Sequence, residues 1–286
     1  MKKIIYILTA AMVLAGCSQK KEIGIQLYSL HQNFNDIEGV LDSLSKIGYT
    51  TVETLNGGGD PNCFGIAPAD FKALCDSKNL TITSTHGGVA LDRADEAATL
   101  QKWSVLFDAL RTMGAKYCVI PGYSFGSTIA EMKQSCEHLN RAGALAHEYG
   151  LQLGMHNHKG DFNTVEGEVI LDYVIKNTDP DKFFIELDVC PHNMGSADPL
   201  HYLKTYPDRI KVLHVKDEKE LGESGKVDFE AVFNQFYKNG WKDAYVEYEL
   251  PFWIGENQQE NEKNLKELWQ GIRRCHKWMS ESKFVK

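Results

Sequence analysis

The chain has 286 residues, of which 43% are hydrophobic and 24% are charged. This is the composition of a globular protein, and it excludes a disordered chain, a collagen-like repeat and a multi-pass membrane protein. The formal net charge is −8 and no basic stripe is present, so nucleic acid is not expected as a partner. The length admits one large barrel or two ordinary domains.

The first sixteen residues have the features of an export signal. Two lysines precede the apolar run 4–14, which is too short to span a bilayer comfortably. The run ends in Leu14-Ala15-Gly16-Cys17, which resembles a bacterial lipobox, the motif in which the cysteine is lipid-modified and becomes the first mature residue. We therefore expect a signal peptide over 1–16, lipidation of Cys17 and a short tether over 17–22.

Two alternatives remain open for this segment: an ordinary cleaved signal peptide, and a cytosolic protein with an apolar N-terminus. The lipobox resemblance implies a protein that is exported and lipid-anchored to a bacterial membrane, in the periplasm or at the cell surface, with no other membrane contact. A homo-oligomer is left open.

Short β-rich segments alternate with amphipathic helical patterns from residue 22 to the end. Several of the segments are continuously apolar or β-branched, as strands buried on both faces should be. Eight strands are predicted, over 22–30, 50–55, 80–86, 117–121, 151–158, 182–189, 210–215 and 244–250.

Helices are predicted between these strands. The patterns cover 36–47, 94–113, 128–149 and 258–279, and further helices begin at Asp198 and Asp228, whose carboxylates can cap them. Trp103, Phe107 and Leu110 have helical spacing and are expected to pack against the barrel. Eight strand–helix repeats favour a single (β/α)8 TIM barrel over residues 23–286 rather than a doubly wound sheet.

Beyond Cys17, six cysteines are widely spaced and no CxxC pair occurs. Neither a zinc ribbon nor a redox motif is indicated. We expect these cysteines to be mostly buried free thiols.

In a (β/α)8 barrel the active site lies at the C-terminal ends of the strands. Residues two apart on a strand face the same way, so four same-face pairs are expected to point into the barrel mouth. These pairs are His156 with His158, Glu186 with Asp188, His214 with Lys216, and Glu247 with Glu249. Such a mixture of oxygen and nitrogen ligands suits Mn²⁺, Co²⁺, Fe²⁺, Zn²⁺ or Mg²⁺.

These strand ends, taken in order, resemble the sugar phosphate isomerase/epimerase family, the xylose isomerase-like TIM barrels. The matching motifs are HNH at 156–158, ELD at 186–188 with GSADP at 195–199, HVKD at 214–217 and VEYE at 246–249. The resemblance covers essentially all of residues 23–280, and its motifs are more specific for the superfamily than for a substrate.

The resemblance implies a divalent metal ion held by a glutamate, an aspartate, a histidine and a second glutamate. Asp188, His214 and Glu247 match the last three. Where related barrels have the first glutamate, two residues before the strand-five histidine, this chain has Gly154. The fourth ligand is therefore His156, His158 or water, and we expect His156.

Roles are also expected for the remaining ionisable residues of the strand ends. Glu247 or Glu249 is the candidate general base, with His86, His158 or Lys216 as its acid partner and Lys216 as a candidate oxyanion partner. Glu53, His158 and His192 are the expected substrate-binding residues. Each of them has a plainer alternative, as a hydrogen-bonded residue or an ion pair in the barrel mouth.

The resemblance implies a metal-dependent isomerase or epimerase that removes the proton beside the carbonyl of a sugar or keto-sugar and passes through a metal-stabilised enediolate. A dehydratase or lyase of a keto-sugar is the close alternative, because the same site serves both outcomes. The export signal favours an unphosphorylated sugar or keto-glycoside. A non-catalytic carbohydrate-binding lipoprotein is the alternative of a different class.

Overall fold

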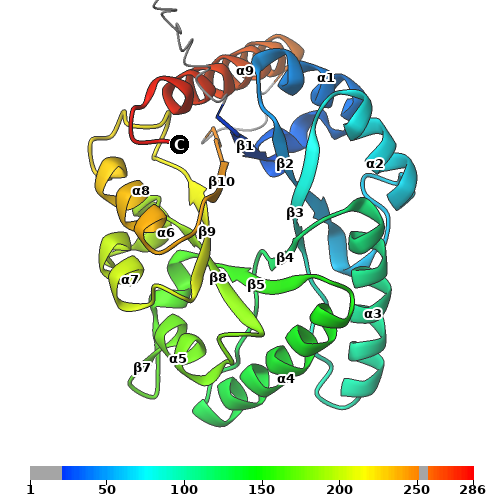
Figure 1. The fold of residues 1–286 in the computed structure, drawn as a ribbon, viewed down its shortest axis with the longest axis vertical. Coiled ribbons are helices and arrows are strands. Elements are labelled where there is room, and N and C mark those ends of the chain that lie inside the picture. The colour runs from blue at the N-terminus through cyan, green and yellow to red at the C-terminus, as the bar shows by residue number, and fades with distance from the viewer. Residues whose placement is uncertain (1–20, 251–256) are drawn as a thin grey trace, which may run out of the picture.

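The computed structural model describes residues 21–250 and 257–286. The predicted signal peptide, Cys17 and most of the tether lie outside this range. Eight parallel strands close into a barrel in the order β1-β10-β9-β8-β5-β4-β3-β2, as Figure 1 shows. They are β1 (Gly24–Gln26), β2 (Thr51–Asn56), β3 (Thr81–Gly87), β4 (Tyr117–Ile120), β5 (Gln152–His156), β8 (Phe183–Asp188), β9 (Ile210–Val215) and β10 (Asp243–Val246).

Helices surround the barrel on the outside (Figure 1). The α-helices are α1 (Ile37–Ile47), α2 (Pro68–Ser77), α3 (Glu96–Met113), α4 (Ile129–Glu148), α5 (Ile170–Asn177), α6 (Pro191–Met194), α7 (Pro199–Thr205), α8 (Phe229–Lys238) and α9 (Gln258–Glu281). A small hairpin of β6 (Thr164–Val165) and β7 (Glu168–Val169) precedes α5, and 3-10 helices cover Leu27–Asp36, Gly57–Gly59 and Lys159–Phe162. The structure is the (β/α)8 barrel that the sequence predicts.

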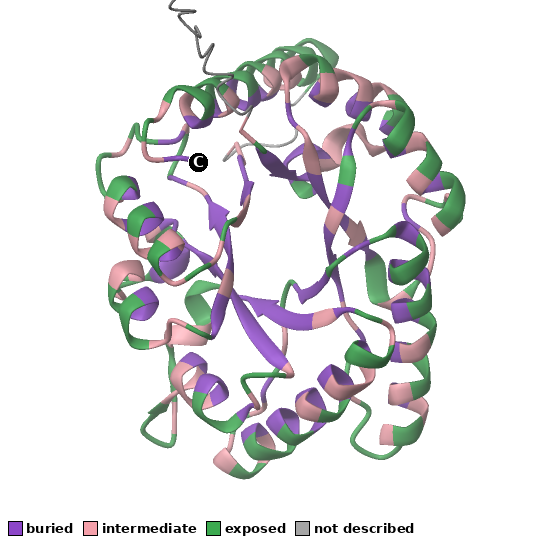
Figure 2. Cartoon of the chain, in the orientation of Figure 1, coloured by how far each residue is buried: buried purple, intermediate pink, exposed green. Residues whose placement is uncertain are grey.

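The core has two parts. Between the strands and the helices, apolar side chains form a continuous layer, and Figure 2 shows buried residues along the strands and on the inner sides of the helices. A second, smaller cluster consists of Tyr117, Val119, Phe184, Val212 and Tyr245, from four strands. The predicted packing residues Trp103, Phe107 and Leu110 are fully buried, and the six described cysteines are free and buried.

Strands β1, β5 and β10 end two to four residues earlier than the sequence predicts. β1 ends at Gln26 because the chain turns into a 3-10 helix at Leu27, and the hydroxyl of Ser29 on that helix accepts a hydrogen bond from the backbone N–H of Tyr248 at 3.0 Å. This side-chain contact takes the place of further strand pairing beyond Val246. β5 ends at His156, so His158 lies in the loop that follows it. β10 ends at Val246, so Glu247 and Glu249 lie in the segment that follows β10.

The sequence pattern does not predict helix α2. Pro68 opens it, as proline often does at the first position of a helix, but only Phe71 and Cys75 are buried along it. Such a weak apolar pattern gives little periodic signal. Within the described residues no helix is long and apolar enough to cross a membrane.

Candidate metal centre and active site

A cavity of about 1050 Å³ opens at the C-terminal ends of the strands. Its lining includes seven of the residues singled out from the sequence: His86, His156, His158, His192, Lys216, Glu247 and Glu249. The location is the one that a (β/α)8 barrel gives to its active site.

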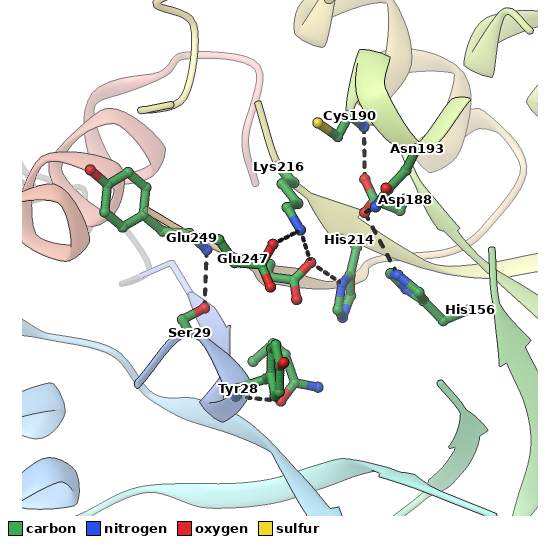
Figure 3. Close-up of polar contacts among 12 residues, drawn as sticks. Tyr28, Ser29, His156, Asp188, Cys190, Asn193, His214, Lys216, Glu247 and Glu249 are labelled. Atoms are coloured by element: carbon green, nitrogen blue, oxygen red, sulfur yellow. Dashed lines mark hydrogen bonds and ion pairs between the residues drawn. The ribbon is translucent and has the colours of Figure 1, made fainter. Parts of the chain in front are cut away.

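Four side chains converge next to this cavity: His156, Asp188 and His214 from β5, β8 and β9, and Glu247 directly after β10. His156 and Glu247 line the cavity, whereas Asp188 and His214 do not. One ligand atom from each of His156, Asp188, His214 and Glu247 lies within 4.8 Å of the others, and all four residues are buried. His156 Nε2 is 3.6 Å from Asp188 Oδ2, and His214 Nδ1 is 3.3 Å from Glu247 Oε2, as Figure 3 shows. We call these four residues the upper cluster.

Asp188 is held in one orientation by its neighbours. The backbone N–H of Cys190 donates to Asp188 Oδ1 at 2.7 Å, and the Asn193 amide donates to Oδ2 (Figure 3). Asn157 Oδ1 accepts from the Asp188 backbone N–H at 2.9 Å. Burial nevertheless raises the pKa of Asp188 to about 6, because a buried carboxylate that lacks a full counter-charge favours the proton.

Lys216 lines the cavity and contacts a carboxylate of the upper cluster. Its ammonium donates to Glu247 Oε2 at 2.9 Å and to Glu249 Oε2 at 2.7 Å (Figure 3). Burial opposes the charge of Lys216, but the carboxylates of Glu247 and Asp188 raise its pKa above the usual value. Burial also favours the protonated form of Glu247, yet His214 and Lys216 hold its pKa well below the usual range. Both groups are therefore charged at neutral pH.

A second layer of ionisable groups lies against the upper cluster. It consists of Glu53, His86 and Glu186, and we call it the lower cluster. Glu53 Oε2 is 2.6 Å from His214 Nε2, and Glu186 Oε2 is 2.8 Å from His86 Nε2 and 3.2 Å from His214 Nε2. Burial favours the protonated form of Glu53, yet His86 and His214 hold its pKa near 2.

Glu186 is the opposite case. Burial and the charge of Glu53 raise its pKa to about 7, as expected where two buried carboxylates compete for the same cations. His86 and Glu186 form a second group with His156 and His214 whose ligand atoms also lie within 4.8 Å of one another.

The structure changes the reading of Glu53. Its strand-end position predicts a substrate-binding residue in the barrel mouth, but the Glu53 side chain is fully buried and does not line the cavity. His86, by contrast, lines the cavity while its Nε2 contacts Glu186 within the lower cluster. The sequence places Glu186 at a strand end and predicts no role for it. Its same-face spacing to Asp188 was the signal that could have assigned it, whereas Gln26 and Ser84, which bind Glu53, gave no such signal.

Gly154 is explained by packing. A Cβ atom at this position would lie 2.7 Å from the ring of Phe184, which is buried in the smaller core cluster. Phe184, which pairs with Gly154 on the neighbouring strand β8, therefore occupies the space that a side chain at position 154 would need. Two residues further along the same face of β5, His156 reaches the upper cluster, and His158 does not belong to it.

The donor set fits a divalent metal ion. Two imidazole nitrogens and two carboxylate oxygens form a mixed set that suits zinc, manganese, cobalt or iron. Burial and the nearby charges of His214 and His86 hold the pKa of His156 well below its usual value, so this imidazole is neutral and keeps a lone pair for a ligand bond. His156 Nδ1 and Glu186 Oε1 are buried without a hydrogen-bond partner, and such orphaned atoms call for an unseen partner.

Fold and site together define a class: parallel (β/α)8 barrels with a buried cluster of histidines and carboxylates at the mouth. A family model described as "Xylose isomerase-like TIM barrel" matches residues 41–275, and the chain belongs to this family. A model of the prokaryotic membrane lipoprotein lipid attachment site matches residues 1–18.

Solved structures and curated relatives agree with this assignment. A sugar phosphate isomerase/epimerase from Parabacteroides distasonis has a TM-score of 0.82 and 30% identity over 93% of this chain and 100% of its own. An inosose dehydratase from Lacticaseibacillus casei is 27% identical over 198 residues, which cover 64% of each protein; the chain thus spans less than two thirds of that relative's length. The fold alone is shared with the IolI protein containing a bound zinc atom (TM-score 0.69, 16% identity, 92% and 99% coverage).

Proposed function

We propose that the protein is a divalent-metal-dependent isomerase or epimerase that removes and returns the proton beside the carbonyl of a sugar or keto-sugar. The observation that carries this proposal is the upper cluster itself. His156, Asp188, His214 and Glu247 lie at or directly after the ends of four adjacent strands and converge beside Lys216 and Glu249, next to one cavity. The relatives named as a sugar phosphate isomerase/epimerase and an inosose dehydratase support a sugar-like substrate.

The upper cluster would hold the metal, with His156 in the place of the missing glutamate. A divalent cation bound there supplies a Lewis acid that polarises a carbonyl oxygen and acidifies the neighbouring C–H bond. The bound zinc of one structural neighbour supports zinc as one candidate; manganese, cobalt and magnesium are the others.

The other residues of the cavity would carry out the proton transfers and position the groups that take part in them. Glu249 lines the cavity with a partly exposed side chain, so its carboxylate takes the proton from the substrate carbon. Lys216 holds Glu249 in place by its 2.7 Å hydrogen bond and faces the developing negative charge. Burial lowers the pKa of His158, so its neutral imidazole is free to exchange a proton on the second face, while His192 contacts the substrate at the rim.

Return of the proton to the opposite face of the same carbon gives epimerisation, and its return to the neighbouring carbon gives isomerisation. Loss of a β-hydroxyl as water gives dehydration instead, and the inosose dehydratase relatives favour this as the second candidate. A non-catalytic carbohydrate-binding lipoprotein is the alternative of another class. Transfer of solvent deuterium to a sugar or keto-glycoside by the metal-loaded protein separates catalysis from mere binding.

We expect Glu249→Gln to keep the metal and lose proton exchange. The amide retains the size of the side chain but cannot accept the proton, and loss of a general base typically lowers the rate about 10²–10⁴-fold. Metal content and solvent deuterium incorporation, measured on the same preparation, check this. Glu220→Gln is the control, because Glu220 pairs with Arg274 and does not line the cavity. If Glu249→Gln still exchanges solvent deuterium at the wild-type rate, Glu249 is not the base, and Glu247 becomes the candidate.

Cys17→Ser should release the mature protein from the membrane. The hydroxyl cannot take the place of the thiol in lipid attachment, and no described helix offers another anchor. Fractionation of cells and metabolic lipid labelling of both forms provide the measurement. Membrane association that is unchanged in the variant would contradict the lipoprotein assignment.

A further inference from the structure

We propose that Glu53 is a positioning residue for the metal centre, which fixes the tautomer of His214 so that His214 presents Nδ1 to the metal. This inference rests on the proposed metal site. Its starting point is that the two ring nitrogens of His214 face different layers. Nε2 lies 2.6 Å from Glu53 Oε2, and Nδ1 lies 3.3 Å from Glu247 Oε2 in the upper cluster.

Glu53 can act only as an acceptor toward His214. Gln26 Nε2 donates to Glu53 Oε2 at 2.6 Å, and the Ser84 hydroxyl donates to Oε1 at 2.5 Å. Gln26 is itself oriented, because its Oε1 accepts the backbone N–H of Tyr28 at 2.9 Å. Side chains from β1, β3 and β9 thus hold one fully buried carboxylate that has no contact with the cavity.

A carboxylate in this position directs the proton of the imidazole. If Nε2 of His214 carries the hydrogen that Glu53 accepts, the lone pair of a neutral ring lies on Nδ1, on the side of Asp188 and Glu247. Histidine ligands of metals commonly donate their other ring N–H to a carboxylate, which fixes the ring and raises its basicity. The hydrogen bond that Glu53 accepts from Nε2–H therefore leaves Nδ1 as the ring atom of His214 that binds the metal.

Local backbone geometry places Glu53 at this depth. The register between β2 and β3 shifts between Val52 and Glu53, and the register between β8 and β9 shifts between Ile185 and Glu186. Irregularities of this kind re-aim side chains and are common beside active sites. Both carboxylates of the lower cluster follow such a shift, and both approach Nε2 of His214.

The test compares Glu53→Gln with Glu53→Ala in the full barrel domain. Loss of a residue that orients a metal ligand typically weakens metal binding about 10–100-fold, and we expect Glu53→Gln near the low end because its amide oxygen can still accept from His214. Zinc affinity is measured by competition with a chromophoric chelator. The tautomer of His214 is read from ¹⁵N chemical shifts of its ring with and without zinc.

Glu96→Gln is the matched control. Glu96 also accepts from a buried imidazole, His138, at 2.8 Å, but between α3 and α4. The Glu96→Gln substitution should leave zinc affinity unchanged. Zinc affinity within twofold of wild type in both Glu53 variants, with the Nε2–H tautomer retained, would overturn the positioning role while the metal site stands. Two zinc ions per chain would also overturn it, because the lower cluster would then itself ligate. A wild-type protein that binds no zinc would overturn the metal site as well.

A separate observation concerns Lys21, the first described residue. Its ammonium donates to the backbone carbonyls of Ser282 at 2.6 Å, Ser280 at 3.0 Å and Met279 at 3.4 Å. Lysine stabilises a helix end in this way by binding its last carbonyls. The contact fixes the start of the barrel to the C-terminal end of α9, beside the entry into β1 and opposite the cavity.

From this contact we infer that the lipid surface lies against the end of the barrel where the strands begin, with the cavity facing away from it. Three residues separate Cys17 from Lys21, so a lipid on Cys17 lies within about 15 Å of Lys21 however the tether runs. Helix α3, with 18 residues, spans about 27 Å from the cavity end to the opposite end. The substrate would then reach the cavity from solution rather than from the membrane.

The experiment uses the full-length lipidated protein in vesicles that carry nitroxide-labelled lipid head groups. A fluorophore is attached at Lys242→Cys, just before β10, or at Lys219→Cys, in the loop after β9. Both lysines are exposed. We expect strong loss of fluorescence at position 242 and little at 219, and a smaller difference when Lys21→Ala is added. Equal quenching, or stronger quenching at 219, would overturn the orientation.

Discussion

Replacing His214 with alanine is expected to abolish divalent-metal binding and catalytic activity while the barrel still folds. His214 is fully buried and is the residue at which the two clusters meet, since its nitrogens approach Glu53, Glu186 and Glu247. Its removal deletes one ligand and leaves three carboxylates with less positive charge between them. We expect metal affinity to fall by at least about a hundredfold, beyond the loss typical for an orienting residue.

The same substitution will also lower stability, because an uncompensated buried charge costs about 3–5 kcal/mol. His138→Ala separates the two effects. His138 is another fully buried histidine with a carboxylate partner, Glu96, but it lies between α3 and α4. Metal content, urea unfolding and solvent deuterium exchange are measured for both variants. Full metal occupancy and activity in His214→Ala would place the site elsewhere and would favour the non-catalytic binder.

Gly154→Glu, which restores the glutamate of related barrels, is expected to destabilise the protein rather than supply a metal ligand. The Cβ atom alone would lie within 2.8 Å of three ring atoms of Phe184, a side chain that is 1% exposed. Overpacking of this kind costs about 1–3 kcal/mol for the smallest side chain, which is the loss we expect for Gly154→Ala. The glutamate adds a buried charge and should lower the unfolding midpoint further.

Urea unfolding and metal affinity of the two Gly154 variants provide the check. Gly160→Ala is the control, because a Cβ atom there meets no other atom within 4 Å. In the double variant Gly154→Ala with Phe184→Leu the smaller side chain makes room, so the combined loss should be less than the sum of the single losses. A stable Gly154→Glu protein that binds metal more tightly would show that this position can act as a ligand after all.

The sequence determined the barrel and the face on which the site lies. Continuously apolar strands alternating with amphipathic helices admit few other arrangements, and the (β/α)8 prediction is confirmed by the closed strand order and by the family match. The two-residue spacing of strand side chains placed four pairs of ionisable residues at the barrel mouth, and the family resemblance singled out Asp188, His214 and Glu247 among them as metal ligands. Strand ends were less certain, because tertiary contacts such as that between Ser29 and Tyr248 decide where pairing stops.

Only the tertiary structure decided the depth of each ionisable group. In the sequence, Glu53 and Glu186 cannot be told apart from the strand-end residues that line the cavity. In the structure, each follows a register shift, and both carboxylates contact Nε2 of His214. Likewise, the residues next to Gly154 in the sequence do not predict that the Phe184 ring, on the adjacent strand, occupies the space where a side chain at position 154 would lie. Register and stagger depend on how all eight strands close together, which is a property of the whole barrel and not of any one segment.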